Sequence, residues 1–113
     1  ESAVAAARAD LAAAEVAGRA EAVRLGAERD RLDRSLARLA GAIVPRTSVA
    51  LDLARSAFLN GEVPFPRLLE LWYDWFHART ELTNAEAARY GVWAESQALA
   101  GAPLAELLPE VRP

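Results

Sequence analysis

Cysteine, methionine and lysine are absent from this 113-residue chain, and histidine occurs once. Without cysteine the chain can form neither a disulfide framework nor a thiolate metal site. No run comes near the ~18 consecutive apolar residues of a transmembrane helix, so the sequence excludes a helix that spans a bilayer. The first residue is Glu1 rather than Met, as we expect of a processed chain or a fragment.

Signals of catalysis and of nucleic-acid binding are also missing. The chain has no nucleophile elbow, no glycine-rich phosphate loop and no paired-histidine metal motif. All 13 basic residues are arginine, and they are interleaved with 16 acidic residues to a net charge of -3. Nucleic-acid binding requires a basic face, which this distribution does not provide. We therefore expect a structural and interaction element that needs no cofactor, and neither an enzyme nor a nucleic-acid-binding protein.

Alanine dominates the residues that are present. It occurs 27 times and makes up nearly half of the 53% apolar fraction. Alanine and arginine are among the strongest helix formers, but alanine buries little apolar surface. This composition predicts an all-α chain whose helices approach closely along a seam, rather than a thick globular core.

Leucine recurs at one heptad position of the first predicted helix, which predicts a stripe for packing against a neighbouring helix. The members of this stripe are Val4, Leu11, Gly18, Leu25, Leu32 and Leu39. Outward positions pair opposite charges four residues apart, such as Arg29 with Asp33. Pro45 removes an amide donor and disfavours helical geometry at Val44. Because helical periodicity resumes directly afterwards, we favour a kink near Pro45 over a break.

A turn is predicted after the first helix. Asn60 and Gly61 tolerate the left-handed backbone conformation that ends helices, and Pro64 cannot continue one. Gly101 and Pro103 are expected to end the second helix in the same way. We therefore predict a single domain that forms a long antiparallel helical hairpin resembling a coiled coil. This domain, 1–113, consists of a helix of about 2–59, a turn at 60–65, a helix of about 66–100 and a short tail at 101–113.

Two apolar stripes run along the second predicted helix. One holds Leu68, Trp72, Trp75, Leu82 and Trp93, and the other holds Phe65, Leu69, Phe76 and Tyr90. Because the partner helix of a hairpin covers only one stripe, the second stripe requires a further neighbour. We expect the tryptophans to form a packing cluster, since they are the main source of buried area in an alanine-rich chain.

Four polar residues share one face of the second predicted helix, because they are spaced by four, three and four residues. They are Glu70, Asp74, His77 and Glu81. Three interpretations remain open: a divalent-cation site, a charged surface facing a water-filled lumen, and a solvated face with an incidental histidine. One imidazole and three carboxylates on one helix cannot complete a tetrahedral site without help from another chain. We therefore predict no metal site, with His77 and Glu81 as weak candidates.

Several short motifs follow one another in order along the chain. They are Ile43-Val44-Pro45, Ala50-Leu51, Ala54, Ala57-Phe58-Leu59-Asn60-Gly61, Phe65, Leu68-Leu69 and, further on, Trp93, Leu99 and Gly101. In this order and spacing they resemble the C-terminal repeat of TolC-type outer-membrane efflux channels. The stretch from Ala3 to Ala40 is similar to the long descending helix of that family. Pro64 and Pro66 depart from the family pattern after the turn.

The resemblance implies a homotrimer whose helical hairpins pack into a periplasmic α-barrel, with this chain as a segment of the barrel wall. It implies that the turn at Asn60, Gly61 and Glu62 is the tip on which a periplasmic membrane-fusion adaptor docks, joined to an inner-membrane pump. Phe58 then corresponds to an aromatic gate residue. Glu70 corresponds to an acidic position at the tip entrance, and Asp74 would line the lumen beside it.

The implied location is the periplasmic part of a Gram-negative outer-membrane protein, with any membrane contact made by parts outside this chain. The alternative is a stand-alone coiled-coil domain with a structural or interaction role. That alternative predicts one apolar seam per helix and a stable monomer or dimer. A segment of a barrel wall exposes further apolar surface and should self-associate.

Overall fold

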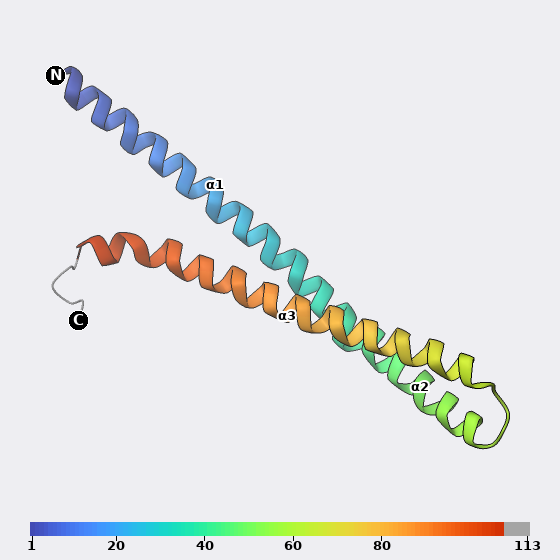
Figure 1. Cartoon of the computed structure of the whole chain (residues 1–113). Coiled ribbons are helices and arrows are strands. Elements are labelled where there is room, and N and C mark those ends of the chain that lie inside the picture. Colours follow the sequence, from blue (N-terminus) through green and yellow to red (C-terminus); the bar gives the residue numbers. More distant parts are fainter. Residues whose placement is uncertain (108–113) are drawn as a thin grey trace. The chain divides into compact units, whose positions relative to one another are not determined.

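The computed structural model describes the backbone of residues 1–107 and the side chains of residues 1–101. This part of the chain contains helices and no strand, so the predicted all-α fold class is confirmed (Figure 1). The elements in chain order are α1 (Ser2–Arg38), the π-helix η1 (Leu39–Ile43), α2 (Val44–Leu59) and α3 (Phe65–Leu107). The described residues form two compact units, one of Arg31–Arg89 and one of Glu1–Asp30 with 90–107.

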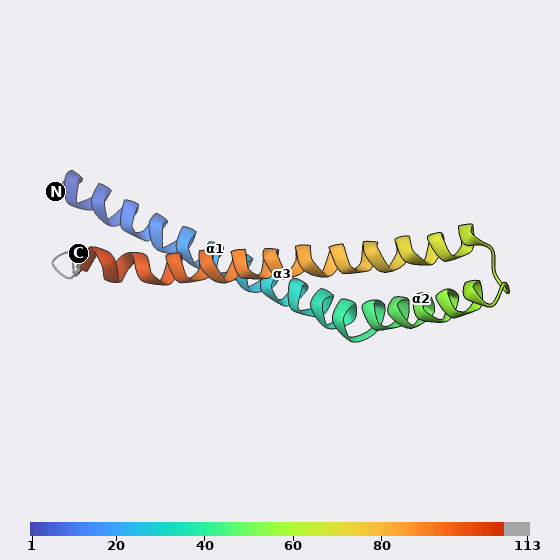
Figure 2. The ribbon, with the colours of Figure 1, turned by 60° about the horizontal axis from the view of Figure 1, so that its bottom comes forward.

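In the Arg31–Arg89 unit, the helix widens next to Pro45 instead of breaking. In a regular α-helix the proline ring would meet the carbonyl group four residues back. The N–H of Val44 donates instead to the carbonyl of Leu39, five residues back, and the backbone stays right-handed helical on both sides. The Thr47 hydroxyl donates to the carbonyls of Ile43 and Val44, each at 3.0 Å. The ribbon changes direction where it enters α2 (Figure 2).

The π-helix also shifts the buried stripe by one residue. The heptad positions buried in α1 and η1 are Leu25, Leu32 and Leu39, as predicted. Beyond η1, Ala54 is buried and Thr47 is half-buried, so the interval from Leu39 to Thr47 is eight residues rather than seven. A continuous α-helix would turn Arg46 and Leu53 towards the seam. Both are exposed, Leu53 by 67%.

The turn after α2 is a Schellman motif. Gly61 has φ of +74°, while no other residue type has a positive φ in the part that the structure describes. The Gly61 N–H donates to the carbonyl of Phe58 at 3.0 Å, and the Glu62 N–H donates to that of Ala57 at 2.8 Å. These two bonds satisfy carbonyl groups that the end of α2 leaves without helical partners. The predicted glycine turn therefore requires a positive φ at Gly61.

The buried side of α3 in this unit follows intervals of three and four residues. Ala78 is buried, and the half-buried members are Leu68, Leu71, Trp75 and Leu82. Proline is tolerated at the start of α3 because first-turn amides have no helical acceptor. The predicted stripe is wrong for Trp72, which is 40% exposed. It lies one residue past the seam, which passes through Leu71.

In the other unit, the apolar stripe of α1 is covered only in part. Leu25 and Val92 are buried, and Gly18 is half-buried. Val4 and Leu11 are 54% and 62% exposed, so the prediction that they belong to the packed stripe is wrong. The heptad pattern continues through this segment, but no described side chain covers it.

α3 extends to Leu107, so the prediction that the helix ends at Gly101 is wrong. Proline in a helix interior removes one backbone hydrogen bond, but Pro103 stands among alanine and leucine, which favour the helix. The rest of the predicted tail, residues 108–113, lies outside the described residues. Within the described range, no helix has an apolar stretch sufficient to cross a membrane.

The one-residue shift at η1 predicts a tolerated deletion. Removing Gly41 in a Pro45→Ala background should convert the π-turn into an α-turn and keep Thr47 and Ala54 in the seam. We expect the same unfolding free energy as Pro45→Ala alone, measured by urea denaturation followed by circular dichroism. Deleting Ala27, the matched control, should rotate Leu25 out of phase with Leu32 and lose about 1.5–3 kcal/mol. Equal losses for the two deletions would contradict this account of η1.

Candidate functional site

The predicted tip is built on the Schellman turn. Asn60, Gly61 and Glu62 are all exposed, and Asn60 caps α2 by donating its N–H to the Ser56 carbonyl at 3.1 Å. The predicted gate residue, Phe58, packs its ring against Phe65 with 5.9 Å between centroids. The turn thus presents one carboxylate, that of Glu62, next to a pair of packed aromatic side chains.

In the described part of the chain, the four predicted polar residues of α3 do not come together in one cluster. His77 and Glu81 contact each other at 3.0 Å, and Glu70 pairs with Arg67 at 3.0 Å. Asp74 is exposed between them. Among the described residues, no three carboxylate, imidazole or thiol groups come close enough to hold a metal ion. The arrangement is a solvent-facing row of charge, and it closes no coordination shell.

The tryptophans do not form the expected cluster. Trp72 stacks on Phe76 with 5.3 Å between centroids and an interplanar angle of 11°, and it meets the edge of Tyr73 at 5.3 Å. Trp93 is 49% exposed and lies 5.5 Å from Tyr90. The helix seam is narrow, because small residues such as Ala78 occupy it, so rings one position away remain at its edge.

Large apolar side chains are exposed on both sides of the turn. On α2 they are Val49, Leu53, Phe58 and Leu59, and on α3 they are Phe65, Leu69, Trp72, Tyr73, Phe76, Tyr90 and Trp93. Val49 and Leu53 each stand two residues from Leu51, and residues two apart on a helix point to nearly opposite sides. Since Leu51 is buried, α2 has an apolar side in addition to the one in its seam.

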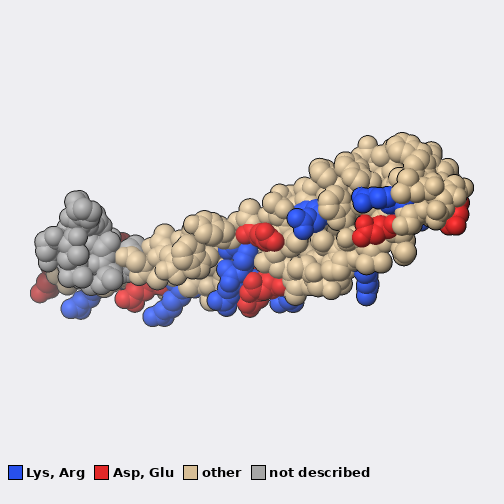
Figure 3. All heavy atoms as spheres, turned by 90° about the horizontal axis from the view of Figure 1, so that it is seen from below, with Lys and Arg blue, Asp and Glu red and all other residues tan. Residues whose placement is uncertain are grey.

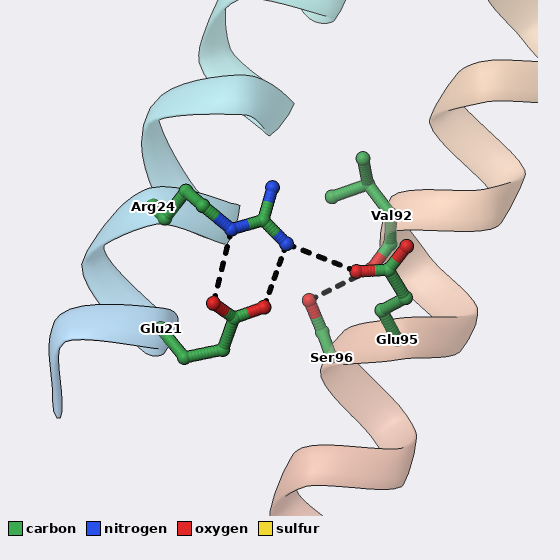
Figure 4. Close-up of polar contacts among 5 residues, drawn as sticks. All are labelled: Glu21, Arg24, Val92, Glu95 and Ser96. Atoms are coloured by element: carbon green, nitrogen blue, oxygen red, sulfur yellow. Dashed lines mark hydrogen bonds and ion pairs between the residues drawn. The ribbon is translucent and has the colours of Figure 1, made fainter. Parts of the chain in front are cut away.

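In the unit that contains Glu1–Asp30 and the segment from Tyr90, an ion-pair network joins α1 to α3 (Figure 4). The Arg24 guanidinium donates to both carboxylate oxygens of Glu21, at 3.0 and 2.6 Å, and to Glu95 at 3.1 Å. The hydrogen bonds from Arg24 lower the pKa of Glu21, and the same contact raises the pKa of Arg24. Beside it, the Ser96 hydroxyl donates to the Val92 carbonyl at 2.9 Å.

A second contact between helices lies in the Arg31–Arg89 unit. Arg89 donates to Asp33 at 2.7 Å, and its side chain is 28% exposed. The predicted pairing of Asp33 with Arg29 is therefore replaced by a pairing distant in sequence, while Arg29 contacts Asp30 at 3.4 Å. On the face shown in Figure 3, basic and acidic side chains are interleaved without a continuous patch of one sign.

Sequence reasoning missed the bonds from Arg24 to Glu95 and from Arg89 to Asp33. No local signal could have found them, since each requires the register of two helices. No protein-family model, no curated protein and no solved structure matches this chain.

The contact between Glu21 and Arg24 predicts a specific pH response. Because the folded-state pKa of Glu21 is lowered, its stabilising contribution is present above the ordinary carboxyl pKa and is lost as pH falls through the lowered value. Titration of the Glu21 carboxyl carbon by NMR should therefore give a midpoint below the ordinary range. Arg24→Gln should return it to that range, whereas Glu95→Gln should leave it low. A midpoint unaffected by Arg24→Gln would contradict the assignment.

Proposed function

We propose that α3 runs antiparallel to the arm formed by α2, η1 and the end of α1 from Arg31, in a hairpin with Gly61 at its apex. Two contacts support this arrangement within the Arg31–Arg89 unit. Phe58 and Phe65 meet close to the turn, while Asp33 and Arg89, equally distant from Gly61 in sequence, meet far from it. Contacts symmetric about a turn are those of two helices that run in opposite directions.

We further propose that this hairpin is a segment of the periplasmic α-barrel of a TolC-type efflux channel, and not an enzyme. The observation that carries the proposal is the exposed apolar surface on both α2 and α3, beyond the sides that form the seam. A helix in a barrel wall has neighbours on two flanks, so it needs apolar side chains on two flanks. An isolated two-helix protein gains nothing from exposing side chains such as Leu53 or Phe76 to water.

In this proposal the neighbouring hairpins of a homotrimer cover the exposed side chains. Asn60, Gly61 and Glu62 form the tip that docks a periplasmic adaptor, which links the channel to an inner-membrane pump. Glu70 and Asp74 line the lumen beside the gate residue Phe58. Their exposure on one helix face is compatible with a water-filled duct. The chain would lie in the periplasm as part of an outer-membrane protein.

A stand-alone coiled-coil domain is the second candidate. It is favoured by the heptad-spaced burial of Leu25, Leu32 and Leu39 and by the direct ion pair between Asp33 and Arg89. These contacts need only one partner helix, and the chain supplies it. The two candidates differ in whether the remaining apolar surface has an occupant.

Self-association separates the candidates. We expect the chain to oligomerise in sedimentation experiments, because the second apolar side requires a cover. A Trp72→Gln and Phe76→Gln double variant should shift it towards monomer, since both side chains are at least 40% exposed. Glu81→Gln on the acidic face should leave association unchanged. A wild-type chain that remains strictly monomeric at high concentration would favour the stand-alone domain.

The tip assignment is tested by Gly61→Val in the full-length parent protein. A side chain with a β-carbon at this positive φ costs about 1–2 kcal/mol, so folding should survive. Docking of another backbone should suffer more, because the β-branched side chain blocks close approach. We expect loss of efflux complementation with trimer assembly and membrane insertion retained.

Gly26→Ala is the matched control, since Gly26 lies in α1 with a negative φ and open space around it. It should leave efflux unchanged. Wild-type efflux in a correctly assembled Gly61→Val trimer would show that the turn is only a connector.

A further inference from the structure

An apolar groove lies between α2 and α3 in the Arg31–Arg89 unit. Its volume is about 330 Å³.

 The groove is lined by Leu51, Arg55, Phe65, Leu68, Leu69 and Trp72. Its size is at the lower end of the roughly 300–1,000 Å³ that is typical of small-molecule sites.

The walls of the groove are held in place by contacts outside it. Leu51 is buried in the seam of α2, so its side chain is fixed from behind. The Phe65 ring packs on Phe58, and the Trp72 ring stacks on Phe76. Each aromatic ring of the wall thus has a second ring that restrains it. A ligand would meet a surface that is already formed, which reduces the entropy lost on binding.

Arg55 is the one charged residue of this lining. Arg24, Arg67 and Arg89 each donate to a carboxylate. For Arg55, the described part of the chain shows no ion pair. A guanidinium at the edge of an apolar surface suits a carboxylate, which it binds through two parallel N–H···O bonds. The lining therefore combines apolar contact area with one positive charge.

We propose that this groove binds an apolar carboxylate, whose aliphatic or aromatic body lies against Trp72 and Leu69 while its carboxylate pairs with Arg55. Charge complementarity selects this class of ligand, because a neutral apolar ligand would leave the guanidinium unused and a cation would be repelled by it. Because a neighbouring hairpin that covers Leu69 and Trp72 would also close the groove, the groove is open to a ligand in the unassociated chain, and binding is measured at a concentration at which sedimentation shows monomer.

Isothermal titration of the 113-residue chain with octanoate tests the proposal. Octanol, the neutral probe of the same length, measures the apolar contribution alone. We expect saturable binding of octanoate about tenfold tighter than that of octanol, as a charge-assisted hydrogen bond contributes. Arg55→Gln should reduce octanoate affinity to that of octanol and leave octanol binding unchanged. Leu69→Ala should weaken both probes by a similar factor.

Arg46→Gln is the matched control, because Arg46 is on the same helix, nine residues away and so on nearly the opposite side. It should leave both affinities unchanged, and circular dichroism should show equal helix content in all variants. Three results would overturn the proposal: no saturable octanoate binding, equal affinity for octanol, or octanoate binding that persists in Arg55→Gln.

Discussion

The seam of small and medium apolar side chains is the constraint on which the remaining structure depends. Leu25, Leu32 and Leu39 can be buried together only if every seventh residue returns to one side of the helix. Alanine at Ala54 and Ala78 keeps the facing surface shallow. A seam this narrow buries few large residues, so the aromatic side chains of α3 remain at its edge. These side chains form the exposed apolar surface and part of the groove wall described above.

The π-helix shows how the chain reconciles this seam with a proline. A proline alone would have removed a hydrogen bond and bent the helix. The wider turn at Leu39–Ile43 accommodates the ring and advances the stripe by one position, so that Thr47 and Ala54 lie in the seam. The π-helix thus connects two stretches of buried residues, those of α1 and those of α2, that a continuous α-helix would place on different sides.

Much of this was predictable from local pattern. The helices, the glycine turn and the burial of Leu25, Leu32 and Leu39 follow from periodicity and turn chemistry. The exposure of Val4 and Leu11 was not predictable, because a heptad pattern identifies the side of a helix that can pack but not whether a partner helix reaches it. The pairing of Asp33 with Arg89 depended on the register between helices, which no short window of sequence contains.

The partial cover of α1 has a consequence for local stability. Residues before Gly18 have exposed side chains, so their helical state depends on the intrinsic preference of alanine and arginine rather than on packing. Isolated helical segments of this kind open from their ends on a submicrosecond timescale. Backbone amides there should exchange with deuterium readily, and protection should rise along α1 towards Leu25, which makes the helix a graded element rather than a uniform rod.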